Sequence, residues 1–117
     1  MTSEQPQPTK LCVLVVSDTD ANRLMEQMVE AGFSATKIGS TGGFLRRGSV
    51  TILSGVTTDG MDRLMELVGE VCHARKEFVP VQTLPFLGEG GFPSEPVEVR
   101  VGGAIVFVLD IERFERV

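Results

Sequence analysis

The chain has 117 residues, of which 42% are apolar and 23% charged, and 16 acidic against 11 basic side chains give it a net charge of −5. This length suits one globular domain. The excess of acid argues against a general nucleic-acid binder, because phosphate backbones are held mainly by Lys and Arg. The charge is uneven, since residues 31–58 contain no Asp or Glu and carry +3. An anionic ligand is therefore expected to be tolerated only in that window.

We expect no targeting or membrane signal at the amino end. The longest apolar run, Leu11 to Val16, is far shorter than the ~20 residues of a membrane-spanning helix, and no basic-then-apolar signal peptide precedes it. The two cysteines lie in apolar segments and form neither a disulfide framework nor a metal-binding set. These features predict a cytoplasmic protein without a metal. Residues 1–10 are expected to be a disordered tail, and residues 11–117 the folded domain.

The first strand and helix have clear signals. Leu11 to Val16 is short, β-branched and apolar throughout, which predicts a strand buried on both faces. Asp18 or Thr19 can cap the helix that follows, and Gly32 can end it.

The middle of the chain contains two strands and a second helix. Residues 34–40 and 49–57 predict strands. From Asp59 onwards apolar residues repeat at steps of three and four, which predicts an amphipathic helix. Residues 80–96 hold four of the six prolines, so we expect a long lid or binding loop there.

The last third predicts a hairpin. Residues 97–101 alternate apolar and charged side chains, Gly102-Gly103 suits a tight turn, and residues 104–109 read as a buried strand. A short helical turn over residues 111–114 would finish the chain.

These elements follow the order β-α-β-β-α-β-β. The quartet Arg-Leu-Met-Glu occurs at residues 23–26 and again at 63–66, at the same point of two strand-helix units. This repetition favours a duplicated βαβ unit. We therefore predict an α+β, ferredoxin-like βαββαβ sandwich, with two helices on one face of an antiparallel sheet and an added C-terminal strand.

The glycine pair in Thr41-Gly42-Gly43 is the strongest candidate for a binding site. Successive backbone N–H groups at paired glycines can converge on a phosphate. Phe44 directly after them can stack on a base, and Arg46 and Arg47 add positive charge. The alternative is an ordinary turn, with Phe44 in the core and both arginines in water.

Two motifs also give the chain a resemblance to a known family. Thr41-Gly42-Gly43-Phe44-Leu45-Arg46 followed by Gly48, together with Val101-Gly102-Gly103-Ala104 and Val106-Phe107-Val108, resembles the cyclic di-AMP receptors, PII-like signal-transduction proteins of the PstA type. The likeness spans Leu11 to Phe114. It implies a homotrimer of PII-like, ferredoxin-like subunits that binds cyclic di-AMP in clefts between subunits. No reaction is implied; the large loops would rearrange to regulate an unknown downstream protein.

Carried over by position, the resemblance gives the ligand-binding residues Thr36, Thr41, Gly42, Gly43, Phe44, Leu45, Ser49 and Gly55. Thr36 and the backbone at Gly55 are expected to contact an adenine. The backbone N–H groups of residues 43–45 are expected to contact phosphate. The chain departs from the family at three positions: Ser34 replaces an Arg, Ser49 replaces an Asn, and Arg116 replaces a Gln.

Two other functions stay open. Because Ser34 lacks the donors of an Arg, the ligand could be ATP, ADP or another adenine nucleotide. The acid-free window could instead be the interface of a purely structural trimer. Catalysis is not expected, because Cys72 and His73 are adjacent on a helix and point about 100° apart. Asp18 and Asp20 favour helix capping over a metal pair.

Overall fold

The computed structural model describes residues 6–39, 48–79 and 97–117. Along these residues the elements are β1 (Lys10–Ser17), α1 (Asp18–Glu30), β2 (Thr36–Ile38), β3 (Ser49–Val56), the 3-10 turn η1 (Thr58–Gly60), α2 (Met61–Cys72), β4 (Arg75–Val79), β5 (Val97–Val101) and β6 (Ala104–Asp110). No helix in these ranges is long and apolar enough to span a bilayer.

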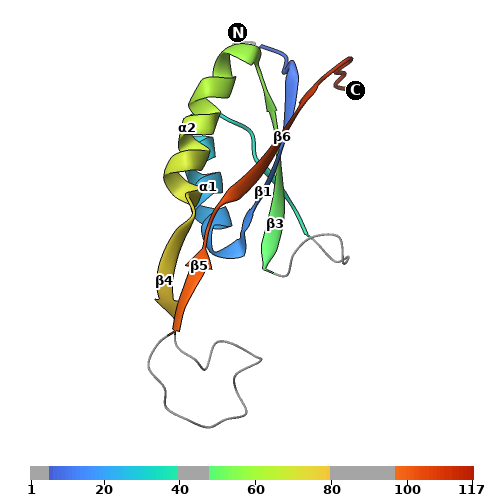
Figure 1. The fold of residues 1–117 in the computed structure, drawn as a ribbon. Coiled ribbons are helices and arrows are strands. Elements are labelled where there is room, and N and C mark those ends of the chain that lie inside the picture. The colour runs from blue at the N-terminus through green and yellow to red at the C-terminus, as the bar shows by residue number, and fades with distance from the viewer. Residues whose placement is uncertain (1–5, 40–47, 80–96) are drawn as a thin grey trace.

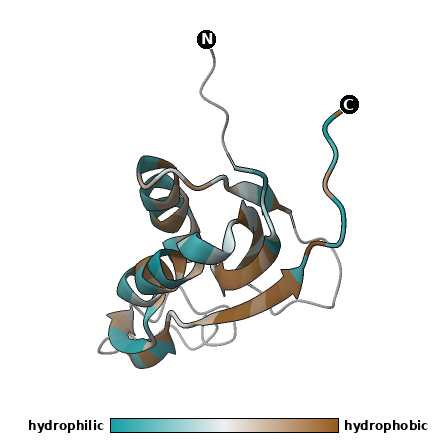
Figure 2. Ribbon diagram, turned by 90° about the horizontal axis from the view of Figure 1, so that it is seen from above, coloured by the Kyte–Doolittle hydropathy of each residue, from teal (hydrophilic) through white to brown (hydrophobic). Residues whose placement is uncertain are grey.

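The main sheet has four antiparallel strands in the order β2-β3-β1-β6. Both helices lie on one of its faces (Figures 1 and 2). With β6 as the fourth strand, this is the strand order of a ferredoxin-like βαββαβ sandwich. The α+β fold predicted from the repeated strand-helix unit is therefore confirmed. The leucines of the repeated quartet, Leu24 and Leu64, are both fully buried between the helices and the sheet.

The prediction of a C-terminal hairpin between residues 97–101 and 104–109 is wrong. β5 pairs with β4 in a separate two-stranded sheet, here called the ribbon, and β6 pairs with β1. The extra strands are thus inserted between α2 and the last strand of the sandwich rather than added at the C-terminus. Gly102 and Gly103 have φ of 81° and 85°, and the Gly103 N–H donates to the Cys72 carbonyl. The two glycines redirect the chain from the ribbon into the sheet instead of reversing it.

The first strand is buried on one face only, so the expectation of two buried faces is also wrong. Cys12, Leu14 and Val16 are 0–1% exposed against the helices, whereas the alternate residues of β1 are half-buried. The apolar run therefore supplies two different surfaces, a helix-covered core and a second apolar face.

That second face, called the open face, is the side of the main sheet away from both helices. Its described members are Thr36 and Ile38 of β2, Thr51 and Leu53 of β3, Leu11, Val13 and Val15 of β1, and Ile105, Phe107 and Leu109 of β6. None of these residues is charged. In the single chain Ile105, Phe107 and Leu109 are 55%, 54% and 49% exposed. A contiguous apolar surface of this kind marks an interaction face.

Several boundaries also differ. Ser17, rather than Asp18 or Thr19, caps α1, because its hydroxyl accepts the Thr19 N–H at 3.3 Å. The second predicted strand is shortened to Thr36–Ile38, and α2 begins at Met61 after the 3-10 turn. Residues 111–114 form no helical turn.

The start of the chain is tied to the domain before β1 begins. Thr9 donates its N–H to the Val56 carbonyl at 2.9 Å, and the Ile111 N–H donates to the Thr9 carbonyl, also at 2.9 Å. The Thr9 hydroxyl accepts the Thr58 N–H at 3.0 Å. Thr9 and Lys10, which fall inside the expected tail, thus join β3 to the segment that follows β6.

Candidate nucleotide-binding site

Two of the expected adenine contacts lie side by side at one end of the β2–β3 pair. Thr36 pairs with Leu53, so continuing this register places Ser34 opposite Gly55. The Gly55 N–H donates to the Ser34 hydroxyl oxygen at 3.3 Å. Ser34 and Thr36 are exposed and Gly55 is half-buried. The structure therefore gathers a hydroxyl pair and a glycine backbone beside the open face.

Ser49 lies away from this group. It begins β3 opposite Ser17, six residues before Gly55, which corresponds to about 20 Å along a strand. Within one chain the structure does not bring Ser49 together with Thr36 and Gly55.

The glycine-pair segment, which includes Thr41, Gly42, Gly43, Phe44 and Leu45, lies outside the described residues. Its C-terminal neighbour Gly48 is described and has a φ of 81°. The Gly48 carbonyl accepts the Asp18 N–H at 2.7 Å. The chain that leaves this segment is therefore fastened to the first residue of α1.

Arg116, in the place of a family Gln, makes a local contact. Its guanidinium lies over the Phe114 ring, 5.8 Å from the ring centroid. That distance is within the range of a cation–π interaction. The charge of Arg116 is thus directed at its own C-terminal segment in the single chain.

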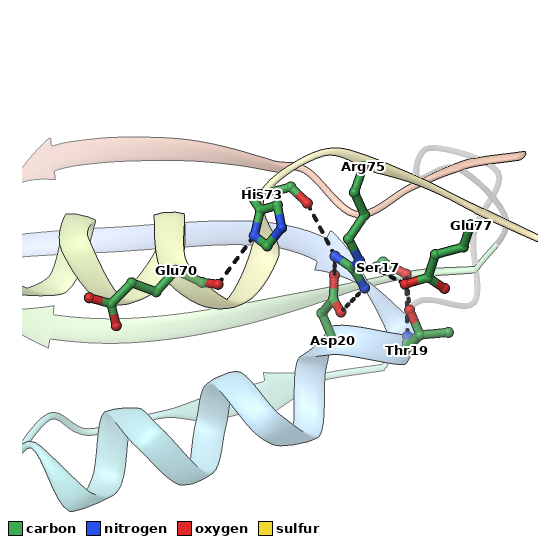
Figure 3. Close-up of polar contacts among 7 residues, drawn as sticks. All are labelled: Ser17, Thr19, Asp20, Glu70, His73, Arg75 and Glu77. Carbon is green, nitrogen blue, oxygen red and sulfur yellow. Dashed lines mark hydrogen bonds and ion pairs between the residues drawn. The ribbon is translucent and has the colours of Figure 1, made fainter.

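A polar cluster that the sequence did not predict joins the ribbon to the sandwich (Figure 3). Arg75 donates to both carboxylate oxygens of Asp20, at 2.9 and 3.4 Å, and to Glu77 at 2.8 Å. It also donates to the His73 carbonyl at 3.1 Å. The Asp20 side chain is only 5% exposed. These bonds, with Asp20 first, raise the pKa of Arg75 further above its usual value. No local pattern could have revealed the pair, because 55 residues separate its partners.

Cys72 is buried in the core, and His73 contacts the backbone at the end of α2. Cys72 is 1% exposed, and His73 places Nδ1 at 3.2 Å from the Glu70 carbonyl oxygen. Burial, and to a smaller extent the charge of Asp20, raises the pKa of the Cys72 thiol from 9.0 to about 11. A thiolate nucleophile is disfavoured at neutral pH. In the described ranges, His, Cys, Asp and Glu form no group of three that could hold a metal ion.

The raised pKa of Cys72 predicts a pH dependence of stability. The folded chain holds the thiol proton more tightly than the unfolded chain, so this contribution is complete below pH 9 and is lost as the pH rises from about 9 to about 11. Chemical denaturation across this range should show a falling free energy of unfolding, with a shallower fall in Cys72→Ala. Burial also raises the pKa of Cys12. The Cys12→Ala variant therefore measures how much of the pH-dependent loss of stability comes from Cys12. An equally steep fall in Cys72→Ala would contradict the assignment.

The fold and these groups define a class, a small ferredoxin-like α+β binding domain with polar groups beside an uncharged sheet face. Residues 9–117 match the cyclic-di-AMP receptor family, and the chain belongs to that family. This confirms the resemblance seen in the glycine-rich motifs, and it supports nucleotide binding and signalling. The chain is also similar to a solved structure, a functionally unknown protein from Pediococcus pentosaceus ATCC 25745. The TM-score is 0.72 and the identity 35%, covering 96% of this chain and 100% of that chain.

Proposed function

We propose that the protein is a non-enzymatic, cytoplasmic receptor that binds cyclic di-AMP in clefts between the subunits of a homotrimer. Membership of the cyclic-di-AMP receptor family over residues 9–117 is the observation that carries this proposal. In this reading Thr36 and the backbone at Gly55 hold an adenine, and the N–H groups of residues 43–45 hold phosphate. Thr41, Gly42 and Ser49 complete the proposed set of ligand-binding residues.

The open face supports assembly. It presents ten apolar or hydroxyl side chains without a charge, and the β6 residues among them stay half exposed in the single chain. Packing this face against neighbouring subunits would remove apolar area from water, which stabilises an oligomer by roughly 25 cal/mol per Å². Thr36 is a member of the face and Gly55 continues its β3 row. A cleft at the rim of the subunit contact would therefore include both.

The signal would pass through the loops. Ligand binding is expected to order residues 44–48 and 80–96. This change would expose or hide a surface for the downstream protein. The bond between Gly48 and Asp18 fixes one end of the first loop.

Isothermal titration calorimetry with cyclic di-AMP, cyclic di-GMP, ATP and AMP tests the proposal. We expect cyclic di-AMP to bind most tightly, with one molecule per subunit. Thr36→Val keeps the side-chain shape and removes the hydroxyl, so it should weaken binding by about two- to tenfold. Thr51→Val, the same change on the same face, is the control and should bind as the parent protein does.

The same panel separates the alternatives. Tighter binding of ATP than of cyclic di-AMP would assign the protein as a sensor of another adenine nucleotide. Ser34 favours this candidate, because a serine hydroxyl offers a base one donor, fewer than the guanidinium of an Arg. No binding and no change in melting temperature with any nucleotide would leave a structural trimer. Steady hydrolysis of a cyclic dinucleotide would overturn the non-enzymatic assignment.

A further inference from the structure

The segment before β1 covers Gly55. A Cβ atom built on Gly55 would lie 3.0 Å from Cβ and 3.2 Å from Cγ of Pro8, closer than ordinary van der Waals contact. The Pro8 ring therefore occupies the space beside the Gly55 Cα atom, where other residues carry a side chain. Pro8 is itself half-buried, whereas Pro6 and Gln7 are exposed.

The bonds of the next residue hold Pro8 in this position. Thr9 is bonded through its N–H to Val56, through its carbonyl to Ile111, and through its hydroxyl to Thr58. These partners come from the end of β3, the turn before α2, and the segment after β6. Figure 1 shows the N-terminal part of the chain at this same end of the sheet. Pro8 directly precedes the anchored Thr9 and is therefore held over Gly55.

The contact joins the segment before β1 to the proposed ligand site. The match to the receptor family begins at residue 9, so Pro8 is the residue immediately before it. Gly55 lies within the match. The residue that precedes the anchored Thr9 therefore sits against a residue of the proposed adenine site.

We propose that Pro8 is an internal competitor for the nucleotide base, covering Gly55 in the free protein and moving aside when the base binds. This inference rests on the proposed function, because it takes Gly55 as part of the ligand site. A ring within contact distance of the Gly55 Cα atom leaves no room for a second flat group at the same place. The measured association constant is then the intrinsic association constant multiplied by the fraction of chains in which Gly55 is uncovered. The same device regulates access: anything that holds the amino end in place weakens nucleotide binding.

The test compares two full-length variants with the same chemical change. Pro8→Gly removes the ring that covers Gly55, and Pro6→Gly makes the change at an exposed residue two positions earlier. In calorimetric titration with cyclic di-AMP, we expect Pro8→Gly to bind about three- to tenfold more tightly than the parent protein, and Pro6→Gly to bind equally. Melting temperatures without ligand show that both variants are folded.

The outcomes distinguish this inference from the function on which it rests. Binding only by Pro8→Gly, with none by the parent protein, would support complete coverage of the site. If the parent protein binds and Thr36→Val weakens binding, but Pro8→Gly binds equally or less tightly, the competitor role is wrong and the receptor function stands. If neither the parent protein nor Pro8→Gly binds cyclic di-AMP, both proposals are wrong. An equal gain in Pro6→Gly would also overturn the specific role of Pro8.

Discussion

Phe107→Glu is expected to convert the proposed trimer to a monomer. Phe107 lies on β6 opposite Val13 of β1, within the open face, and is 54% exposed in the single chain. A carboxylate at this position would have to be buried among apolar side chains of neighbouring subunits, where desolvation opposes association by several kcal/mol. We expect the association constant to fall by at least about a hundredfold. Sedimentation velocity at micromolar concentration measures the change directly.

Phe78→Glu is the matched control for this prediction. Phe78 lies on the ribbon and is 70% exposed, more than Phe107, but it is not part of the open face. The control should keep the oligomeric state of the parent protein. A Phe107→Glu protein that remains trimeric would show that the open face is not the subunit contact. Loss of cyclic di-AMP binding together with the trimer would support a site that is shared between subunits.

Arg75→Met is expected to cause the largest loss of stability among changes at the base of the ribbon. The substitution keeps a long apolar side chain and removes the cation, so the Asp20 carboxylate, 5% exposed, is left without its ionic partner. Breaking such a pair from one side is strongly destabilising, because the remaining charge stays buried. Glu77→Gln also alters an Arg75 contact, but the Glu77 side chain is 50% exposed and should matter far less. Thermal unfolding of the two variants should show a drop several times larger for Arg75→Met.

A double variant separates the loss of the pair from the loss of packing. Asp20→Asn in the Arg75→Met background removes the orphaned charge, so it should recover part of the lost melting temperature. If Asp20→Asn lowers the stability of Arg75→Met further, the buried carboxylate is not the cause. Increased hydrogen exchange in β4 and β5 of Arg75→Met, with unchanged exchange in β1 and β3, would place the effect at the junction of the ribbon.

The sequence predicted the fold where the pattern was local. The three- and four-residue repeat of α2 and the recurrence of Leu24 and Leu64 in one quartet are enough to place two helices in equivalent units. The partner of β5 could not be predicted in this way. β4 begins with Arg75, Lys76 and Glu77, so it lacks the alternating apolar pattern of a strand, and the nearby glycine pair suggested a hairpin instead.

The candidate site was harder to predict. Thr36 and Gly55 carry no chemical signal of their own and were found through the resemblance to the receptor family. Their proximity follows from strand register, which a sequence motif does not contain. The Pro8–Gly55 contact joins residues 47 positions apart and depends on the absence of a side chain at Gly55. Physical contacts of this kind appear only when the backbone is placed in space.

The ribbon ends at the paired residues Val79 and Val97, so residues 80–96 leave and return at neighbouring points. A stretch with adjacent ends can be exchanged for one of different length without shifting a single partner in the main sheet. Homologues would therefore be free to diversify there while the domain beneath stays the same. Grafting the equivalent stretch from another member of the family, or a small fluorescent reporter, is expected to yield a folded chimaera.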